Sequence, residues 1–212
     1  LGWLLLCKQT EDELRHSQQM LQQAVSGTIS ALATTREMRD PYTAGHARRV
    51  AELAFAIARA MEFTENQMAG VRMAGYLHDV GKIVVPAEIL AKPGKISEYE
   101  FGIIKTHALA GHEILRTIDF PWPIAEATFA HHERLDGSGY PRGLKEGDIL
   151  TEARILAVAD TVEAMASHRP YRPSLGTEKA IQQVKQSRGR LYDARVVDVC
   201  VDLFKTGRFA FT

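Results

Sequence analysis

The sequence predicts an all-α fold, and two observations support this prediction. Apolar residues recur at helical spacing almost everywhere after residue 40, whereas strand-like alternation is confined to 83–85, which is too short to count. Glycine and proline gather in two segments, 81–94 and 132–148, that separate the periodic stretches. A helical bundle with two irregular loops is therefore expected. The second loop is long for a compact domain, and such loops are usually functional.

The first forty residues carry a repeat of their own. Its positions step by four and three, and they are Leu14, Gln18, Leu21, Val25, Thr28 and Leu32. This is the heptad spacing of a coiled coil, and its two polar positions would weaken pairing while fixing the register. A single amphipathic helix packed on its own domain explains the spacing equally well. We therefore expect an N-terminal coiled-coil-like helix, with both interpretations open.

Further helices are expected in order along the chain. They cover 46–61, 64–77, 97–118, 123–132, 152–167, 177–186 and 194–204. Thr64 is the expected N-cap of the second of these helices. Ser97 and Glu100 have the spacing of a capping box before the third.

Composition restricts the class of protein. The 212 residues contain 26 basic and 26 acidic side chains, and this zero net charge argues against a non-specific nucleic-acid binder. Cys7 and Cys200 lie at opposite ends of the chain, so a reducing, cytoplasmic compartment is expected. The apolar segment 1–7 is too short to cross a bilayer. We interpret the chain as a fragment in two parts. The segment 1–34 would be a linker helix left from an upstream sensor or membrane anchor, and 35–212 the functional domain.

Histidine and aspartate give the strongest functional signal. His78 and Asp79 are adjacent at the end of an apolar helix, and His131 and His132 are adjacent at the end of another. A lone histidine on an apolar face is usually a hydrogen-bonded core residue. Asp160 is harder to explain in that way, because it follows five apolar residues and a buried carboxylate must be paired or bound to metal.

Together with His46 and His107, these residues favour a metal centre inside the bundle. Imidazole and carboxylate ligands without cysteine suit iron, manganese or zinc. Six or more ligands exceed the need of one ion, so two ions are expected. Asp79 could bridge them, with a bridging hydroxide as nucleophile. Such two-metal sites hydrolyse phosphate esters.

Two motifs carry a family resemblance. The sequences HDVGK at 78–82 and HHERLDGSGYP at 131–141 resemble the HD-GYP family, a branch of the HD-domain metal-dependent phosphohydrolases. Four other segments, 40–50, 92–107, 153–165 and 169–173, also resemble the family pattern, so the similarity runs from about 35 to 204. HD alone would be a weak signal, but this combination is highly specific.

The resemblance implies a fold, an activity and a set of site residues. The fold is an HD-domain-like helical bundle, and the activity is hydrolysis of cyclic di-GMP to linear pGpG, in some members onward to GMP. Two divalent ions, iron or alternatively manganese, would be held by His46, His78, Asp79, His107, His131, His132 and Asp160. Asp79 and Lys82 would be catalytic, with Lys82 stabilising a phosphoryl oxygen. The implied substrate contacts are Tyr140, Arg169, Arg172 and Lys82.

One position departs from the family pattern. Members that bind a third metal carry a glutamate four residues before the first histidine, and Tyr42 stands there in this chain. Two ions rather than three, and pGpG as the main product, are therefore expected. The resemblance also implies an upstream sensory or receiver domain. A homodimer through the N-terminal helix is a further expected partner, whereas a nucleic-acid polymer is not.

Other interpretations stay open at this point. The substrate could be cyclic GMP-AMP, or the chain could be a weakly active cyclic di-GMP receptor that signals through its N-terminal helix. Several residues also have plain structural explanations. Lys82 could interact with the negative C-terminal end of a helix dipole. Tyr140 could pack against its own loop, and Arg169 and Arg172 could form a solvated turn. The loop over 132–148 contains Gly139, Tyr140 and Pro141 and is called the GYP loop below; we expect Asp136 to support the metal ligands or to shape this loop rather than to bind a metal. The three remaining histidines, His16, His112 and His168, are expected at the surface.

Overall fold

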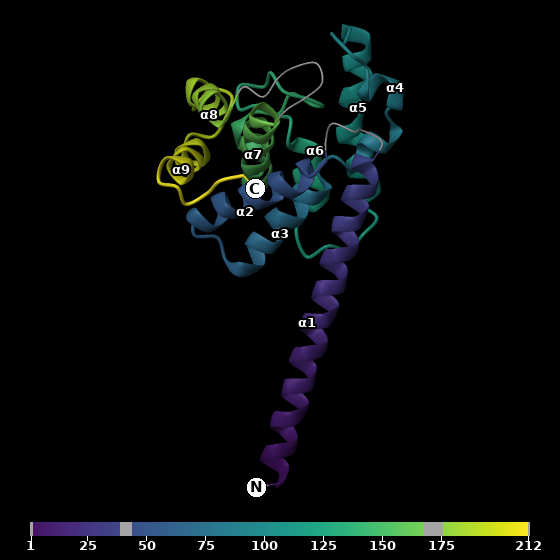
Figure 1. Ribbon diagram of the computed structural model, residues 1–212, viewed down its shortest axis with the longest axis vertical. Helices are drawn as coiled ribbons and strands as arrows, with labels where there is room; N and C mark the ends of the chain where they lie inside the picture. The colour runs from purple at the N-terminus through teal and green to yellow at the C-terminus, as the bar shows by residue number, and fades with distance from the viewer. Residues whose placement is uncertain (1, 39–43, 168–175, 212) are drawn as a thin grey trace.

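The computed structural model describes residues 2–38, 44–167 and 176–211, and these residues form helices without any strand (Figure 1). The α-helices are α1 (Gly2–Glu37), α2 (His46–Ala60), α3 (Glu65–Leu77), α4 (Ala87–Leu90), α5 (Glu98–Leu115), α6 (Ile124–Ala130), α7 (Thr151–Ala166), α8 (Thr177–Gln186) and α9 (Ala194–Lys205). Two 3₁₀ helices, η1 (Val80–Val84) and η2 (Glu146–Asp148), lie between them. The all-α prediction is confirmed.

Local sequence signals set several helix ends as expected. Thr64 caps α3 in a capping box with Gln67, and Ser97 caps α5 in a second box with Glu100. The loop expected over 81–94 instead contains η1 and α4. Both are too short to leave a periodic apolar pattern, which is why the sequence did not show them.

The core lies between α2, α3, α7 and α9. Val50, Leu53 and Ile57 of α2 are fully buried, as are Ile155 and Leu156 of α7. Helix α2 packs against both α3 and α7, and α5 packs against η1 and α6. These contacts bring together the helix ends and helix faces that carry the conspicuous histidines and aspartates.

Helix α1 extends from this bundle as a long rod (Figure 1). Only its C-terminal part packs on the domain, where Ile29, Ala33 and Glu37 are buried. Leu14, Leu21 and Leu32 of the heptad repeat remain more than half exposed, so the repeat is not buried against the described part of the domain. The division at 34/35 stays a prediction, and the described helix runs continuously across it.

The end of α1 is tied to the start of α2. The Glu37 carboxylate accepts hydrogen bonds from the backbone N–H groups of Gly45, at 2.7 Å, and Ala47, at 2.9 Å. These N–H groups belong to a helix N-terminus whose own N-cap residue, Gly45, has no side chain to satisfy them. Glu37 of α1 thus caps the N-terminus of α2. The two residues that it binds, Gly45 and Ala47, stand directly before and after His46.

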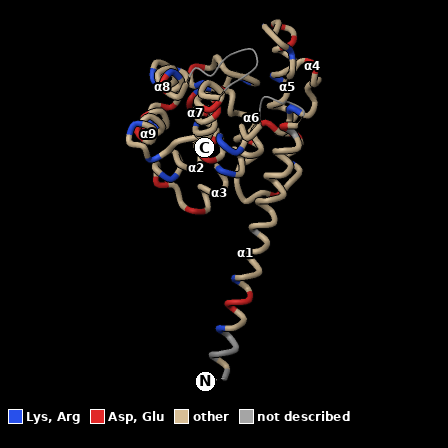
Figure 2. Tube along the Cα trace, viewed as in Figure 1, with Lys and Arg blue, Asp and Glu red and all other residues tan. Residues whose placement is uncertain are grey.

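Charge is mixed over the surface. Basic and acidic residues intersperse over the bundle in the view of Figure 2, in line with the zero net charge. On α1 no Lys, Arg, Asp or Glu occurs between Arg15 and Arg36. None of the helices in the described ranges combines the length and the hydrophobicity that a bilayer span requires.

Candidate metal centre

The fold brings all seven predicted metal ligands to one place. His46 opens α2, His78 follows the last residue of α3, and Asp79 precedes η1. His107 lies in α5, Asp160 lies in α7, and His131 and His132 follow the last residue of α6. Five separate helices therefore supply ligands to one interior point, as in other helical-bundle metal sites.

The ligand atoms form two groups that share Asp79. One group contains Asp79, His107, His131 and His132, the other His46, His78 and Asp79, and within each group the ligand atoms lie within 4.8 Å of one another. The two carboxylate oxygens of Asp79 face different groups. Its Oδ1 is 3.5 Å from His107 Nε2, whereas its Oδ2 is 3.4 Å from His78 Nε2 and 3.8 Å from His46 Nε2. Asp79 thus belongs to both groups, with one carboxylate oxygen toward each.

Asp160 completes the second group. Its Oδ1 lies 3.3 Å from His46 Nε2 and 3.9 Å from His78 Nε2. The Asp160 side chain is 15% exposed, whereas those of His46, His78 and Asp79 are at most 2% exposed. Two imidazoles and two carboxylates therefore face one point.

Hydrogen bonds fix which ring nitrogen each histidine offers. The Nδ1–H groups of His78 and His107 donate to the carbonyls of Gly75 and Ile104 at 2.7 Å, and that of His131 donates to Thr128 at 2.5 Å. A carbonyl can only accept, so the proton resides on Nδ1 and the Nε2 lone pair is free. Yet these three Nε2 atoms are buried without a hydrogen-bond partner in the described structure.

Unpartnered buried nitrogens are costly unless something binds them. Here they point at a shared carboxylate, which is the donor set of a divalent metal site. The residues present therefore fit a pair of divalent metal ions. Burial, reinforced by neighbouring histidines, lowers the pKa of His131 to about 3 and that of His132 well below its usual value. Both rings thus stay neutral at physiological pH, as ligation requires.

Glu163 contacts the candidate metal ligand His46 and was not predicted from the sequence. It is fully buried, and it accepts a short hydrogen bond from His46 Nδ1, one from Arg49 Nε at 2.7 Å and one from the Ser167 hydroxyl at 2.6 Å. This is the carboxylate–histidine pairing that orients a metal ligand. The available signal was its position three residues after Asp160, which places both on one face of α7.

The electrostatics of His46 follow from these neighbours. Burial alone would lower its pKa, but the hydrogen bonds and charges of Asp160 and Glu163 outweigh burial and raise the pKa to about 9. Without a metal ion, the His46 ring therefore carries two protons, one facing Glu163 and one facing Asp160. A divalent cation held by His46 and Asp160 would supply the positive charge in place of the second proton.

Lys82 and Gly81 hold Asp79 in place. Lys82 Nζ lies 2.6 Å from Asp79 Oδ2, so its charge sits directly at the shared carboxylate. A Cβ at Gly81 would stand 2.0 Å from the His107 carbonyl oxygen and 2.3 Å from the Gly111 backbone nitrogen. Only glycine therefore lets η1 approach α5 closely enough for Asp79 to face His107.

The GYP loop forms one wall of the centre. The Tyr140 ring stacks on His132, with centroids 4.6 Å apart and an interplanar angle of 30°. The buried Glu133 carboxylate accepts hydrogen bonds from the backbone N–H groups of Arg142, at 2.7 Å, and Leu144, at 3.0 Å. These bonds fix the position of the loop. Asp136 accepts hydrogen bonds from Ser138, which agrees with the loop-shaping role expected for it. Glu133 was not recognised from sequence.

Some predicted positions lie outside the described residues. These are the substrate contacts Arg169 and Arg172, the departing position Tyr42, and His168. Of the other two histidines expected at the surface, His16 is exposed. The prediction for His112 is wrong: it is half-buried and packs its ring on Phe129, with centroids 5.2 Å apart, because that face of α5 lies against α6.

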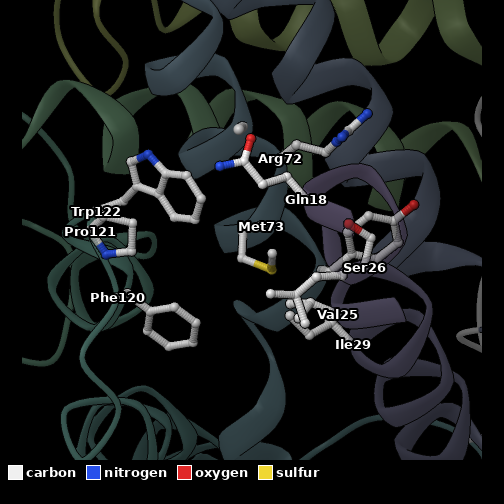
Figure 3. Close-up of a pocket in the computed structure, with 12 residues that line it drawn as sticks. Gln18, Val25, Ser26, Ile29, Arg72, Met73, Phe120, Pro121 and Trp122 are labelled. Carbon is white, nitrogen blue, oxygen red and sulfur yellow. The ribbon is translucent and has the colours of Figure 1, made fainter. Parts of the chain in front are cut away.

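A separate apolar pocket lies away from these ligands. Leu21, Val25 and Ile29 of α1 line it together with Met73 of α3 and Trp122 of the segment before α6 (Figure 3). None of the metal-ligand candidates contributes to it. The pocket belongs to the junction between α1 and the bundle rather than to the metal centre.

Comparison with known proteins places the chain in a family. Residues 30–196 match the model of the HD domain family. The chain belongs to the HD domain family. It is 38% identical over 200 residues to the cyclic di-GMP phosphodiesterase response regulator RpfG of Xanthomonas campestris, covering 93% of this chain and 52% of that protein. It is 42% identical over 179 residues to a cyclic di-GMP phosphodiesterase of Thermotoga maritima, covering 84% and 49%.

The HD-domain fold is also shared with solved structures. A cyclic GMP-AMP specific phosphodiesterase of Vibrio cholerae aligns with a TM-score of 0.66 at 18% identity, over 85% of this chain and 49% of that one. The HD-domain chain spans about half the length of the two sequence relatives above. The resemblance to HD-GYP proteins is confirmed by these comparisons.

Proposed function

We propose that the chain is a metal-dependent phosphodiesterase that opens cyclic di-GMP to linear pGpG. The observation that carries the proposal is the pair of ligand groups sharing Asp79, with three buried Nε2 atoms aimed at them. The names of the relatives support a cyclic dinucleotide as substrate. Two ions, iron or manganese, would be held by the seven residues predicted from sequence.

Two bound divalent ions would lower the pKa of water enough for attack on phosphorus near neutral pH and would neutralise phosphoryl oxygens. The protein's own residues do the rest. The five helices fix the ligand set before substrate arrives, so little reorganisation is needed at the moment of reaction. The Lys82 ammonium, beside Asp79, is placed to stabilise charge that develops on a phosphoryl oxygen as the 3′ oxygen leaves.

Tyr140 supplies an aromatic face beside this charge. Its ring already stacks on His132, so it is placed to contact the substrate where the GYP loop meets the metal ligands. Burial, together with the negative charges of Asp160 and Asp79, raises the pKa of its hydroxyl, which therefore stays protonated. Arg169 and Arg172 remain predicted contacts to the second phosphate or to a base.

The test combines metal analysis with product analysis. Protein purified without oxygen should hold two ions per chain, and with Fe(II) or Mn(II) it should convert cyclic di-GMP to pGpG, as followed by chromatography. Asp79→Ala should lose both turnover and bound metal, whereas Asp119→Ala at an exposed position should keep both. Full activity of Asp79→Ala, or three ions per chain, would contradict the scheme.

A substrate series separates the competing functions. Faster conversion of cyclic GMP-AMP than of cyclic di-GMP would assign the former as substrate, an alternative supported by the names of two 3′3′-cGAMP-specific phosphodiesterases of Vibrio cholerae that are each 36% identical to the aligned part of this chain. Tight binding of cyclic di-GMP without product would identify a receptor. A cytoplasmic location and an upstream sensory or receiver domain stay predictions.

The homodimer through α1 also stays a prediction, and the exposed heptad repeat supports it. Leu14, Leu21, Val25 and Leu32 are between 45% and 66% exposed, and such a row of apolar side chains is stable in water when another helix covers it. Light scattering of the purified chain tests the dimer, since a monomeric mass at micromolar concentration contradicts it.

A further inference from the structure

Beside the candidate metal centre, α5 presents a phenylalanine and a lysine to which no role has been given above, next to Tyr140 of the GYP loop. Phe101 and Lys105 stand four residues apart on α5 and thus on one side of the helix. Lys105 Nζ lies 4.8 Å from the centroid of the Phe101 ring and 5.3 Å from that of Tyr140. The two rings meet edge to face with centroids 6.2 Å apart. We call Phe101, Lys105 and Tyr140 the α5 ledge.

The α5 ledge is continuous with the metal ligands. The Tyr140 ring stacks on His132 and lies 6.4 Å from the ring of His107, centroid to centroid. Phe101 precedes His107 by six residues, which corresponds to about 9 Å along the helix axis. A phosphate held at the metal centre would therefore have its nucleoside within reach of the ledge.

Two features of the ledge are unusual for ordinary surface packing. Phe101 is 45% exposed although it is a large apolar ring next to a buried centre. Lys105 is half-buried over the rings, and among the described residues no carboxylate forms an ion pair with it. Lys92, in contrast, forms an ion pair with Glu100 at 2.7 Å. A partly desolvated ammonium without an acidic partner favours a ligand that brings acceptor atoms.

We propose that the α5 ledge binds a guanine base of the substrate and that Lys105 reads it. This rests on the proposed function and deepens it. Aromatic faces stack any base, so Phe101 and Tyr140 supply affinity without selecting the base. A lysine ammonium has donors only. Guanine presents O6 and N7 as acceptors at its edge, whereas adenine places an amino donor where guanine has O6. Lys105 therefore favours guanine over adenine.

The test measures base preference without any turnover. GMP and AMP carry the same phosphate, so the ratio of their dissociation constants for the Mn(II)-loaded protein, measured by calorimetry, isolates the base. The wild-type chain should prefer GMP. Lys105→Met retains helix propensity and removes the charge, and it should weaken GMP binding about tenfold while leaving AMP binding unchanged. Phe101→Leu should weaken both nucleotides to a similar extent.

Lys179→Met, at an exposed position of α8 on the other side of the bundle from α5, is the matched control and should change neither constant (Figure 1). Equal weakening of GMP and AMP binding in Lys105→Met would indicate that Lys105 contacts the phosphate. That result would refute the proposal that Lys105 recognises guanine. Unchanged binding in that variant, or no preference for GMP in the wild type, would overturn it as well.

Failure of the proposed function has a different signature. A wild-type protein that cleaves no cyclic dinucleotide, yet binds GMP with a preference lost in Lys105→Met, refutes the phosphodiesterase and keeps the guanine site. A protein that cleaves cyclic di-GMP but shows no base preference refutes the guanine site alone.

Discussion

Replacing Glu163 by glutamine tests whether a residue that is not itself a metal-ligand candidate controls metal affinity at the group of His46, His78 and Asp160. Glu163 accepts the Nδ1–H of His46 and the side chains of Arg49 and Ser167, and it is fully buried. Glutamine has nearly the same shape but one acceptor oxygen and no charge. His46 would lose the partner that orients its ring and makes its Nε2 a better ligand.

The expected magnitudes differ for metal binding and for stability. Loss of such a partner reduces metal affinity about 10- to 100-fold, and here the loss should fall on the group of His46, His78 and Asp160. Burial by itself would raise the pKa of Glu163, but the hydrogen bond and charge of His46, with Ser167 and Arg49, lower it from 4.5 to about 2. That difference corresponds to about 3 kcal/mol of folding free energy.

The sign of the pH dependence follows from a lowered carboxyl pKa. The stabilisation is present above pH 4.5 and is lost as pH falls toward 2. The free energy of unfolding of Glu163→Gln should therefore be lower than that of the wild type at pH 7, by up to about 3 kcal/mol. The difference between the two proteins should shrink as the pH is lowered through this range.

The assay is elemental analysis after dialysis against a graded chelator, beside urea denaturation. Glu163→Gln should release one ion per chain at a chelator concentration that leaves two on the wild type. Glu13→Gln, at an exposed position of α1, should behave as the wild type does. Two ions retained with unchanged affinity in Glu163→Gln would refute the reasoning. Simultaneous loss of both ions would show that the two groups do not bind independently.

Two further predictions concern the packing and the occupancy of the centre. Gly81→Ala should lower the free energy of unfolding by about 3 kcal/mol and release metal, because a Cβ would stand 2.0 Å from the His107 carbonyl oxygen. Gly102→Ala, in the helix α5 against which η1 packs, meets no atom within 4 Å and is the control; equal unfolding midpoints in urea for the two variants would count against the close approach. Removal of metal with a chelator should lower Tm. Mn(II) at 1,000 times its Kd should then raise the free energy of unfolding by about 4 kcal/mol, because it binds the folded chain, where three buried Nε2 atoms regain a partner. An unchanged Tm would mean that these nitrogens do not bind the ion.

Much of the metal centre was predictable because its chemistry is local in the sequence. His78 and Asp79, and likewise His131 and His132, are adjacent at helix ends, where an imidazole can donate to one of the last free carbonyls of the helix. Asp160 stood out as a carboxylate within an apolar helix. Residue type and helical spacing were sufficient to nominate these side chains.

The orienting residues were harder to predict because their partners are remote in sequence. Glu163 meets His46 across 117 positions, and Glu37 reaches α2 from a helix whose sequence indicates only a coiled-coil repeat. A buried glutamate is indistinguishable in sequence from an exposed one on the same helix face. His112 was misplaced for the same reason, since only the packing of α5 on α6 shows which side of it is covered.

The sequence by itself determined the fold class, most helix positions, the family resemblance and the choice of the seven metal-ligand candidates. These follow from periodicity, capping residues and the chemistry of imidazole and carboxylate groups. The tertiary structure decided how the ligands divide into two groups, that Asp79 turns one oxygen to each, and that Lys105 lies between two aromatic rings beside them. Those relations depend on the angles and distances between helices, which the packing of the whole core sets.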